Sequence, residues 1–358
     1  DMIEIGAGGG SIANADAMKL LKVGPRSAGS TPGPACYGRG GDGFCVTDAD
    51  LAMGLLDAES FLGGTMKLDL PAMTKALEGL ANSLNVSATD AAAGVYRVVG
   101  ETMASAARAH ATDRGVDFRG IPVLAFGGAG PLHACYVAEL LGSKTVIFPP
   151  LASVLSAFGM LVTPVRYDLV RGAFARLDAL DWTIVERAFN DMLAAGRTAL
   201  AEAGCKPNEI KFSFGGDLRY MGQQNEVTVT FDADPRVKRD IPTIRAAFEE
   251  AYEAQYGLRL PDNAVEMVSW RLTCHGPHIQ RTANTLVAST PGKALGTRPV
   301  RLGGATSTTF QRFAREALAS GQRIDGPALV EERETTTVIL PGWTAVLHAT
   351  GCLIAERH

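Results

Sequence analysis

The sequence of 358 residues is 46% apolar and 20% charged, which is the composition of a folded globular protein, and its length allows about two domains. A net charge of −4 argues against nucleic-acid and membrane-surface partners, and no apolar run approaches the ~20 residues that span a bilayer. The six cysteines lie far apart without a CxxC pair, which favours reduced thiols in the cytoplasm over a disulfide or zinc framework.

The first sixteen residues place a glycine cluster between two short apolar runs. The cluster and the serine that ends it are Gly6, Gly8, Gly9, Gly10 and Ser11. A stretch without Cβ atoms lets a ligand approach the backbone, and consecutive bare N–H groups form a concavity that binds anions. We predict a β-hairpin, with Ile3 and Ile5 on one side and Ile12 on the other, whose glycine tip cradles phosphate. A hairpin with a merely flexible tip is the alternative.

The next elements alternate strands, loop and helices. Residues 12–16 and 18–23 predict two strands. The glycine- and proline-rich segment 24–41 is either a disordered linker or an ordered loop near the site, and Cys36 and Tyr37 within it favour the ordered loop. A helix is expected to start with Thr47 or Asp48 as its N-cap. Residues 71–114 predict helix with a break near Asn85.

A second glycine turn follows the apolar strand predicted over residues 121–126. Its residues are Gly127, Gly128, Ala129 and Gly130. Pro131 then opens a helix, and residues 145–148 form a strand, so the segment predicts a βαβ unit with parallel strands. A ligand would bind the N–H groups at the start of that helix. His133 lies in its first turn, either as a packed residue or as a group that contacts substrate or a partner.

The remaining chain predicts an α+β region followed by strands. Residues 153–162 predict a helix with its apolar side inward, and 183–203 an amphipathic helix. The face expected to be buried in that second helix carries Ile184, Ala188, Met192, Gly196 and Ala199. Two strands within 210–231 flank a polar turn, followed by a helix over 242–256, a strand over 265–274 and β-rich sequence over 298–356.

Two polar groups in this later region are candidates for function. The polar turn offers Arg219, Gln223 and Gln224 for contact with a substrate or another subunit, and a solvated loop is the alternative. Cys274, His275 and His278 match no zinc spacing, so no metal site is predicted there.

Six longer stretches resemble a known family. They read GAGGGSIA from Gly6, VGPRSAGSTPGPACYGRGG from Val23, FGGAGPLHA from Phe126, SVLSAFGMLV from Ser153, DLRYMGQQNEVTV from Asp217 and GPALVEERETTTVILPGW from Gly326. They closely resemble the large A-type subunits of the hydantoinase/oxoprolinase family. That family includes N-methylhydantoinase A, 5-oxoprolinase, and the acetone and acetophenone carboxylases. The resemblance spans essentially the whole chain.

The resemblance implies an α/β fold, with an actin-like (ribonuclease H-like) ATPase lobe of mixed sheet and flanking helices. We expect this lobe over residues 1–165, an α+β region over 166–295 and a β-rich domain over 296–358. It also implies that the first glycine turn holds the β and γ phosphates of ATP with Mg²⁺, and that the second passes under the adenosine. Family members carry a DxGGT phosphate loop in an N-terminal lobe. Because this loop is absent here, the chain is expected to be the C-terminal portion of such a subunit.

The activity implied is ATP-dependent opening of a cyclic amide, in which phosphorylation activates the carbonyl group before water attacks it. Two alternatives remain open: a subunit of an acetone- or acetophenone-type carboxylase, and a lobe that serves assembly without catalysis. Expected partners are the missing N-terminal lobe, a B-type subunit and a small carbonyl substrate. The sequence assigns no catalytic residue.

Overall fold

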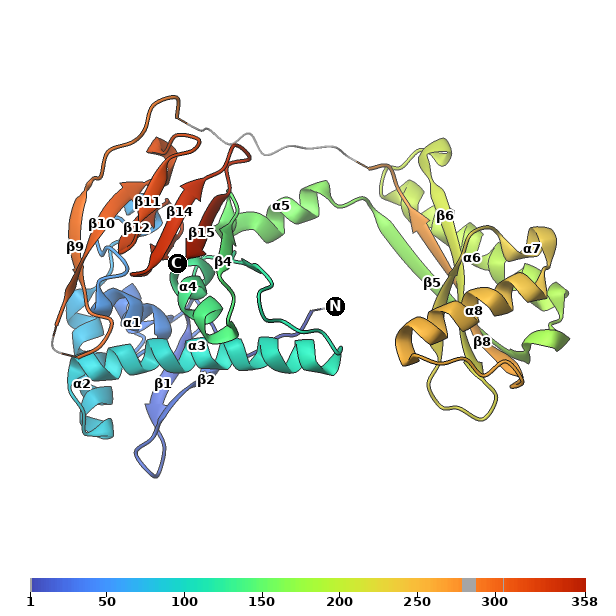
Figure 1. Ribbon diagram of the computed structural model, residues 1–358, viewed down its shortest axis with the longest axis horizontal. Coiled ribbons are helices and arrows are strands. Elements are labelled where there is room, and N and C mark those ends of the chain that lie inside the picture. The colour runs from blue at the N-terminus through green and yellow to red at the C-terminus, as the bar shows by residue number, and fades with distance from the viewer. Residues whose placement is uncertain (1, 279–287, 305) are drawn as a thin grey trace. The chain divides into compact units, whose positions relative to one another are not determined.

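The computed structural model describes residues 2–278, 288–304 and 306–358. The chain divides into two compact units (Figure 1), of which the first comprises Asp1–Phe158 and Thr282–His358 and the second Gly159–Arg281. Each unit has its own hydrophobic core.

The first unit combines helices with three sheets. Its helices are α1 (Val46–Met53), α2 (Leu70–Leu84), α3 (Ala88–Asp113) and α4 (Gly130–Leu141). Its earlier strands are β1 (Ser11–Ala15), β2 (Leu21–Ser27), β3 (Val123–Leu124) and β4 (Thr145–Phe148). Its later strands are β9 (Gly296–Val300), β10 (Thr308–Ala314), β11 (Arg323–Asp325), β12 (Ala328–Glu331), β13 (Thr336–Ile339), β14 (Trp343–Leu347) and β15 (Leu353–Arg357).

The sheets of this unit are a β1–β2 pair, a four-stranded sheet and a five-stranded sheet. The strand orders are β13-β12-β10-β9 and β11-β14-β15-β4-β3. Strands β3 and β4 are parallel and are joined by α4, which confirms the predicted βαβ unit. The break predicted near Asn85 is also confirmed, because Asn85 ends α2 in the left-handed conformation before α3 begins.

The hairpin predicted across the first glycine turn is wrong. Ile3 and Ile5 lie outside any strand and are 52% and 37% exposed. Both edges of β1 are already used: β2 pairs with one, and a bridge from Ile12 to Cys45 occupies the other. The glycine turn is therefore a loop that leads into β1.

The glycine- and proline-rich segment is ordered, as predicted, and the carboxylate of Asp48 holds it. This side chain accepts hydrogen bonds from the N–H groups of Ala35 at 3.1 Å, Cys36 at 2.7 Å and Cys45 at 2.8 Å. Helix α1 begins earlier than expected, because its N-cap is Cys45 rather than Thr47 or Asp48. One buried acidic side chain thus fixes both the loop and the start of the helix.

The domain limits expected at residues 165 and 295 differ from the two units of the structure. The β-rich segment 296–358 does not stand apart, because β15 pairs with β4 in the five-stranded sheet and places Leu353 beside Phe148. Both side chains are fully buried in the core of the first unit. Strands far apart in the sequence therefore complete one sheet.

The second unit is a four-stranded antiparallel sheet with helices packed on it (Figure 1). Its strands, in the order β5-β8-β6-β7, are β5 (Arg166–Arg176), β8 (Val265–His275), β6 (Lys211–Tyr220) and β7 (Val227–Phe231). Its helices are α6 (Trp182–Glu202), α7 (Pro235–Lys238) and α8 (Ile241–Tyr256). Helix α6 packs on β5 and β8, and α8 packs on β7.

Two predicted apolar faces need correction. Helix α6 forms, but its buried face is rotated from the predicted one and carries Val185, Phe189, Met192, Gly196 and Leu200. Helix α5 (Leu155–Val162) also forms, yet none of its residues is buried, so its apolar side does not face inward. The boundary between the two units falls within it, after Phe158, and the core residues described for the two units include none from this helix.

All six cysteines are free thiols. In the described part of the chain, no helix combines the length and apolar character that a membrane crossing needs.

Candidate functional site

A cavity of about 340 Å³ in the first unit lies between the two glycine turns. We call it the glycine cleft, and it is lined by Gly9 and Gly10 from the first turn and by Gly128 and Ala129 from the second. The turns approach each other closely, since a Cβ atom built on Gly9 would lie 3.7 Å from the Cβ of Ala129. The structure thus brings together two motifs that are far apart in the sequence.

Other walls of the cleft come from three further segments. The first comprises α1 and the residues after it, and it contributes Thr47, Asp50, Leu56, Asp57, Ser60, Phe61 and Leu62. The second is the ordered loop, with Pro34 and Tyr37, and the third runs from Glu331 at the end of β12 to Thr336 at the start of β13. The rings of Tyr37 and Phe61 lie 5.9 Å apart and give the cleft an apolar, aromatic part.

The first glycine turn is closed by its own serine. The Ser11 hydroxyl accepts a hydrogen bond from the N–H of Gly8 at 3.0 Å and donates to the carbonyl of Gly6 at 3.3 Å. Gly6 packs against Pro25, because a Cβ there would lie 2.5 Å from the Cβ of that proline. Gly6, Gly8 and Ser11 do not line the cleft. They shape the turn from behind.

The cleft side of this turn presents bare backbone donors. Thr47 fixes the turn to α1, since its N–H and its hydroxyl both donate to the carbonyl of Gly9, at 2.8 and 2.9 Å. Within the described residues, the N–H groups of Gly9 and Gly10 have no acceptor in the protein. Adjacent unpaired N–H groups of this kind form an anion-binding concavity.

The second glycine turn leads into the start of α4. Gly127 has a φ of +94°, a conformation that favours glycine, and the Thr335 hydroxyl donates to the carbonyl of Gly128 at 2.8 Å. Helix α4 begins at Gly130, and its N-cap residue Ala129 makes no side-chain cap. The first N–H groups of a helix lack intrahelical acceptors and attract negative charge. Gly127 and Gly130 support the turn without lining the cleft.

A buried acidic side chain lies at the base of the cleft. Asp50 is 1% exposed and lines the cavity, and its Oδ2 lies 3.4 Å from Nε2 of His133, which is fully buried. That contact has ion-pair distance without hydrogen-bond geometry, and Oδ1 of Asp50 has no hydrogen-bond partner. The ring of Tyr96 packs against His133 in a tilted arrangement, with centroids 4.6 Å apart. His133 therefore contacts Asp50 from behind and does not itself line the cleft.

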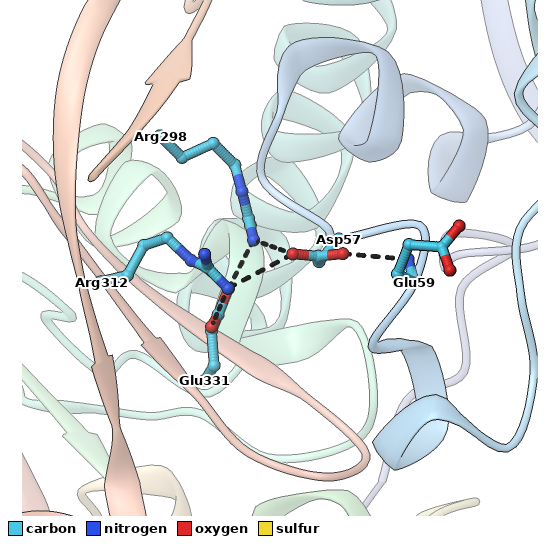
Figure 2. Close-up of polar contacts among 5 residues, drawn as sticks. All are labelled: Asp57, Glu59, Arg298, Arg312 and Glu331. Atoms are coloured by element: carbon cyan, nitrogen blue, oxygen red, sulfur yellow. Dashed lines mark hydrogen bonds and ion pairs between the residues drawn. The ribbon is translucent and has the colours of Figure 1, made fainter. Parts of the chain in front are cut away.

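Two arginines and two carboxylates hold one wall of the cleft (Figure 2). Arg298 donates to Asp57 at 2.5 Å and to Glu331 at 2.8 Å, and Arg312 makes a two-pronged contact with Glu331 at 3.1 and 2.9 Å. Asp57 also accepts the N–H of Glu59. The arginines come from β9 and β10, so this network ties the segment after α1 to the four-stranded sheet.

The ion-pair network and burial change the pKa values of carboxyl groups that line the cleft. Burial alone would raise the pKa of Asp57, but the N–H of Glu59 and the charges of Arg298 and Arg312 outweigh it, so the pKa lies below its ordinary value. The Glu332 carboxyl also lines the cleft, and burial raises its pKa although Arg315 pairs with it at 3.0 Å.

The described lining is strongly acidic. Its carboxylates are Asp50, Asp57, Glu331, Glu332 and Glu334. Against these, the described lining has one cationic side chain, Arg333, which pairs with Glu334 at 3.3 Å. A bound anion would therefore rely on backbone N–H groups and on a cation that accompanies it.

The candidates from the polar turn lie in the second unit and contact residues of that unit. Arg219 is in β6, pairs with Glu266 at 3.0 Å and lies 5.6 Å from the ring of Phe174. Gln223 donates to the Tyr252 hydroxyl at 2.8 Å, and Gln224 is exposed. Contact of these three residues with a substrate or subunit stays a prediction.

Much of the polar cluster expected in that turn belongs to the sheet itself. Asp217 is 3% exposed within β6 and accepts hydrogen bonds from Arg271 at 2.6 Å, Thr228 at 2.7 Å and Ser269. Although burial would raise the pKa of Asp217, these donors lower it, Arg271 most strongly. In the part of the chain that the structure describes, no three histidine, cysteine or acidic residues are grouped to hold a metal ion.

Sequence reasoning missed several cleft residues. Asp50 follows Asp48 on one short helix, and the sequence pattern gave it no role of its own. The segment 331–336 was noted only for its resemblance to a family. Its position beside Gly128 depends on the pairing of distant strands, which no local pattern reveals.

The chain has an α/β fold of the actin-like type, with mixed sheets and flanking helices. A solved structure of acetone carboxylase without nucleotide superimposes with a TM-score of 0.80 at 24% identity, covering 98% of this chain and 52% of that one. This likeness confirms the predicted fold class.

The chain belongs to the hydantoinase/oxoprolinase family. The hydantoinase/oxoprolinase model matches residues 1–169, and the model of the family's C-terminal domain matches residues 178–354. Curated relatives include the caprolactamase subunit alpha of Pseudomonas jessenii, 34% identical over 96% of this chain and 50% of the relative. The acetophenone carboxylase gamma subunit of Aromatoleum aromaticum is 32% identical over 99% of this chain and 50% of the relative. The chain thus spans about half the length of these relatives.

Proposed function

We propose that this chain forms the nucleotide-handling part of an ATP-dependent enzyme that opens cyclic amides. The observation that carries the proposal is the meeting of two glycine turns at one cleft, where the N–H groups of Gly9 and Gly10 have no acceptor among the residues that the structure describes. Phosphoryl transfer relies mainly on positioning and on donors aimed at the developing negative charge. Bare N–H groups of this kind supply such donors.

We assign a different part of the nucleotide to each glycine turn. The β and γ phosphates of ATP would lie against Gly9 and Gly10, with Gly6, Gly8 and Ser11 shaping the turn behind them. The adenosine would lie along Gly128 and Ala129 at the start of α4, which Gly127 and Gly130 support. The acidic lining makes Mg²⁺ the fitting companion of the nucleotide, because Mg²⁺ binds phosphates and water with one or two carboxylates.

The chemistry on the carbonyl group is inferred from the relatives. The caprolactamase relative favours a cyclic amide, in which a phosphorylated carbonyl oxygen becomes a good leaving group before water opens the ring. The acetophenone carboxylase relative favours the second candidate, activation of a ketone for carboxylation. Bicarbonate separates the two, since only a carboxylase would require it and incorporate its carbon.

The partners belong to the proposal too. The relatives are named as subunits, and this chain spans about half of each. We infer that an N-terminal lobe completes the nucleotide site and that a B-type subunit supplies the rest of a cytoplasmic enzyme. Arg219, Gln223 and Gln224 are candidates for contact with that subunit or the substrate.

Calorimetric titration with Mg-ATP tests the nucleotide site. The chain is titrated alone and again after combination with an N-terminal lobe from the family, and binding is expected in the second case. Gly9→Val should weaken the affinity about tenfold or more, a loss of roughly 1.4 kcal/mol. The new side chain would meet the Thr47 hydroxyl, which is 2.7 Å from the built Cβ.

The matched control is Gly79→Ala on α2, where an added Cβ meets nothing within 4 Å. This variant should bind nucleotide as the unaltered chain does. Absence of binding in both titrations of the unaltered chain would leave the non-catalytic alternative, a lobe for assembly only.

A further inference from the structure

We propose that Asp50 is the base that takes a proton from the carbonyl substrate, and that His133 positions it. The inference rests on the proposed function, because it assigns a role within the same glycine cleft. It starts from an unusual pair of observations: Asp50 is 1% exposed, yet one of its carboxylate oxygens has no hydrogen-bond partner in the described part of the chain, and the side chain lines the cavity.

An unsatisfied buried carboxylate lowers stability, so its presence calls for a role outside folding. Asp48, two residues earlier on α1, shows the structural use of the same side chain, since three backbone N–H groups donate to it. Among the described residues, Asp50 receives no such set of donors, and its Oδ1 is buried without a partner while the side chain as a whole lines the cleft. A ligand in the cleft can supply the missing donor.

His133 is held so that it faces the other carboxylate oxygen. Its Nε2 lies 3.4 Å from Oδ2 of Asp50, and its ring packs against that of Tyr96. The hydroxyl of Tyr96 donates in turn to the carbonyl of Leu132 at 3.0 Å, which fixes the Tyr96 ring against α4. His133 cannot reach the ligand because it lies outside the lining. It acts through Asp50 as a positioning residue.

The proton that Asp50 would take is the one beside the reacting carbonyl group. As the Asp50 carboxylate accepts the N–H proton of a cyclic amide, the N–H electron pair forms a C=N bond. The carbonyl π pair then forms the new O–P bond to the γ-phosphorus of ATP. The bond from that phosphorus to the β–γ bridging oxygen breaks, and its electron pair leaves with ADP. Without a base, positive charge would remain on the amide nitrogen.

The test compares variants in the assembled enzyme, with this chain, a family N-terminal lobe and a B-type subunit present. Asp50→Asn removes the base with little change in size, and Asp50→Glu restores a carboxylate. We expect the kcat of amide-dependent ADP release to fall at least 100-fold in Asp50→Asn, with Mg-ATP affinity by calorimetry unchanged. Asp50→Glu should recover part of the rate.

A second variant tests the positioning role. His133→Phe keeps an aromatic ring against Tyr96 but removes the contact with Asp50, so kcat should fall by about tenfold with KM for ATP unchanged. Thermal unfolding of each variant gives the structural control. Asp50→Asn should unfold at the same temperature as the unaltered protein or a higher one, since it removes an unsatisfied buried charge.

The outcomes separate this inference from the proposed function. If the unaltered assembly neither binds nucleotide nor releases ADP in response to an amide, the proposed function fails, and the inference with it. If the unaltered assembly is active and Asp50→Asn turns over at a similar rate, the inference alone is overturned. The inference would also be overturned if Asp50→Asn lowered both the rate and the unfolding temperature and Asp50→Glu did not restore the rate.

Discussion

At the scale of single residues, two aspartates on α1 show how one side chain type serves structure or function. Asp48 is fully buried, and its oxygens accept N–H groups from both the ordered loop and the helix start. Burial, with the charge of Asp48 beside it, raises the pKa of the Cys36 thiol far above its ordinary value. That cysteine is therefore an inert packing residue.

We expect Asp48→Asn to lower the free energy of unfolding by about 2–4 kcal/mol, because an amide donor would replace one oxygen and leave buried N–H groups without an acceptor. Urea unfolding followed by circular dichroism measures the change. Cys36 gives a second signal, since its alkylation should become faster as the loop opens. A loss below about 0.5 kcal/mol would show that the loop is held by other contacts.

The sequence could indicate the glycine turns because turn residues act through the local backbone. Gly9, Gly10, Gly128 and Ala129 were all named from their motifs, and the structure places them around one cavity. Asp50 and the segment 331–336 could not be assigned in this way. Their exposure and partners depend on which distant strands pair, and that information is not local.

At the scale of elements, the position of α6 on its sheet is set by a missing side chain. A Cβ on Gly196 would lie 2.2 Å from Sγ of Cys274 in β8 and 3.3 Å from a methyl carbon of Leu169 in β5. The periodicity of α6 predicted its length well, but the buried face was rotated. Trp182 and Val185 near its start are both apolar, so polarity alone does not tell which side of the helix is buried. Contact with the sheet determines which side of α6 faces the core.

Gly196→Ala should therefore destabilise the protein by about 1–3 kcal/mol through overpacking, although alanine is the better helix former. Gly79→Ala on α2 is the matched change in open space and should stabilise by about 0.5–1 kcal/mol. Chemical unfolding of the two variants measures the change in the free energy of unfolding, which should be negative for Gly196→Ala and positive for Gly79→Ala. If Gly196→Ala also raised the free energy of unfolding, α6 would be able to shift away from β8 at little energetic cost.

At the scale of the whole molecule, the chain is organised as one unit interrupted by another. The second unit is one continuous segment of the chain. The first unit consists of two segments, and strands that come after the second unit in the sequence complete its sheets. The predicted three-part division followed the order of the sequence. It could not anticipate that β15 would return to β4, because strand pairing over two hundred residues leaves no local signal.

Each unit has its own hydrophobic core, and residues that pack in one core unfold together. We therefore expect the two units to unfold separately. Calorimetry of the chain should resolve two transitions. Asp48→Asn should lower the transition of the first unit alone, and Gly196→Ala that of the second alone. Trp182 and Trp270, two of the three tryptophans, lie in the second unit, so intrinsic fluorescence should identify its transition. If both variants shift both transitions together, the two cores unfold as one cooperative body, and the destabilisation seen at Gly196 would also reach the glycine cleft.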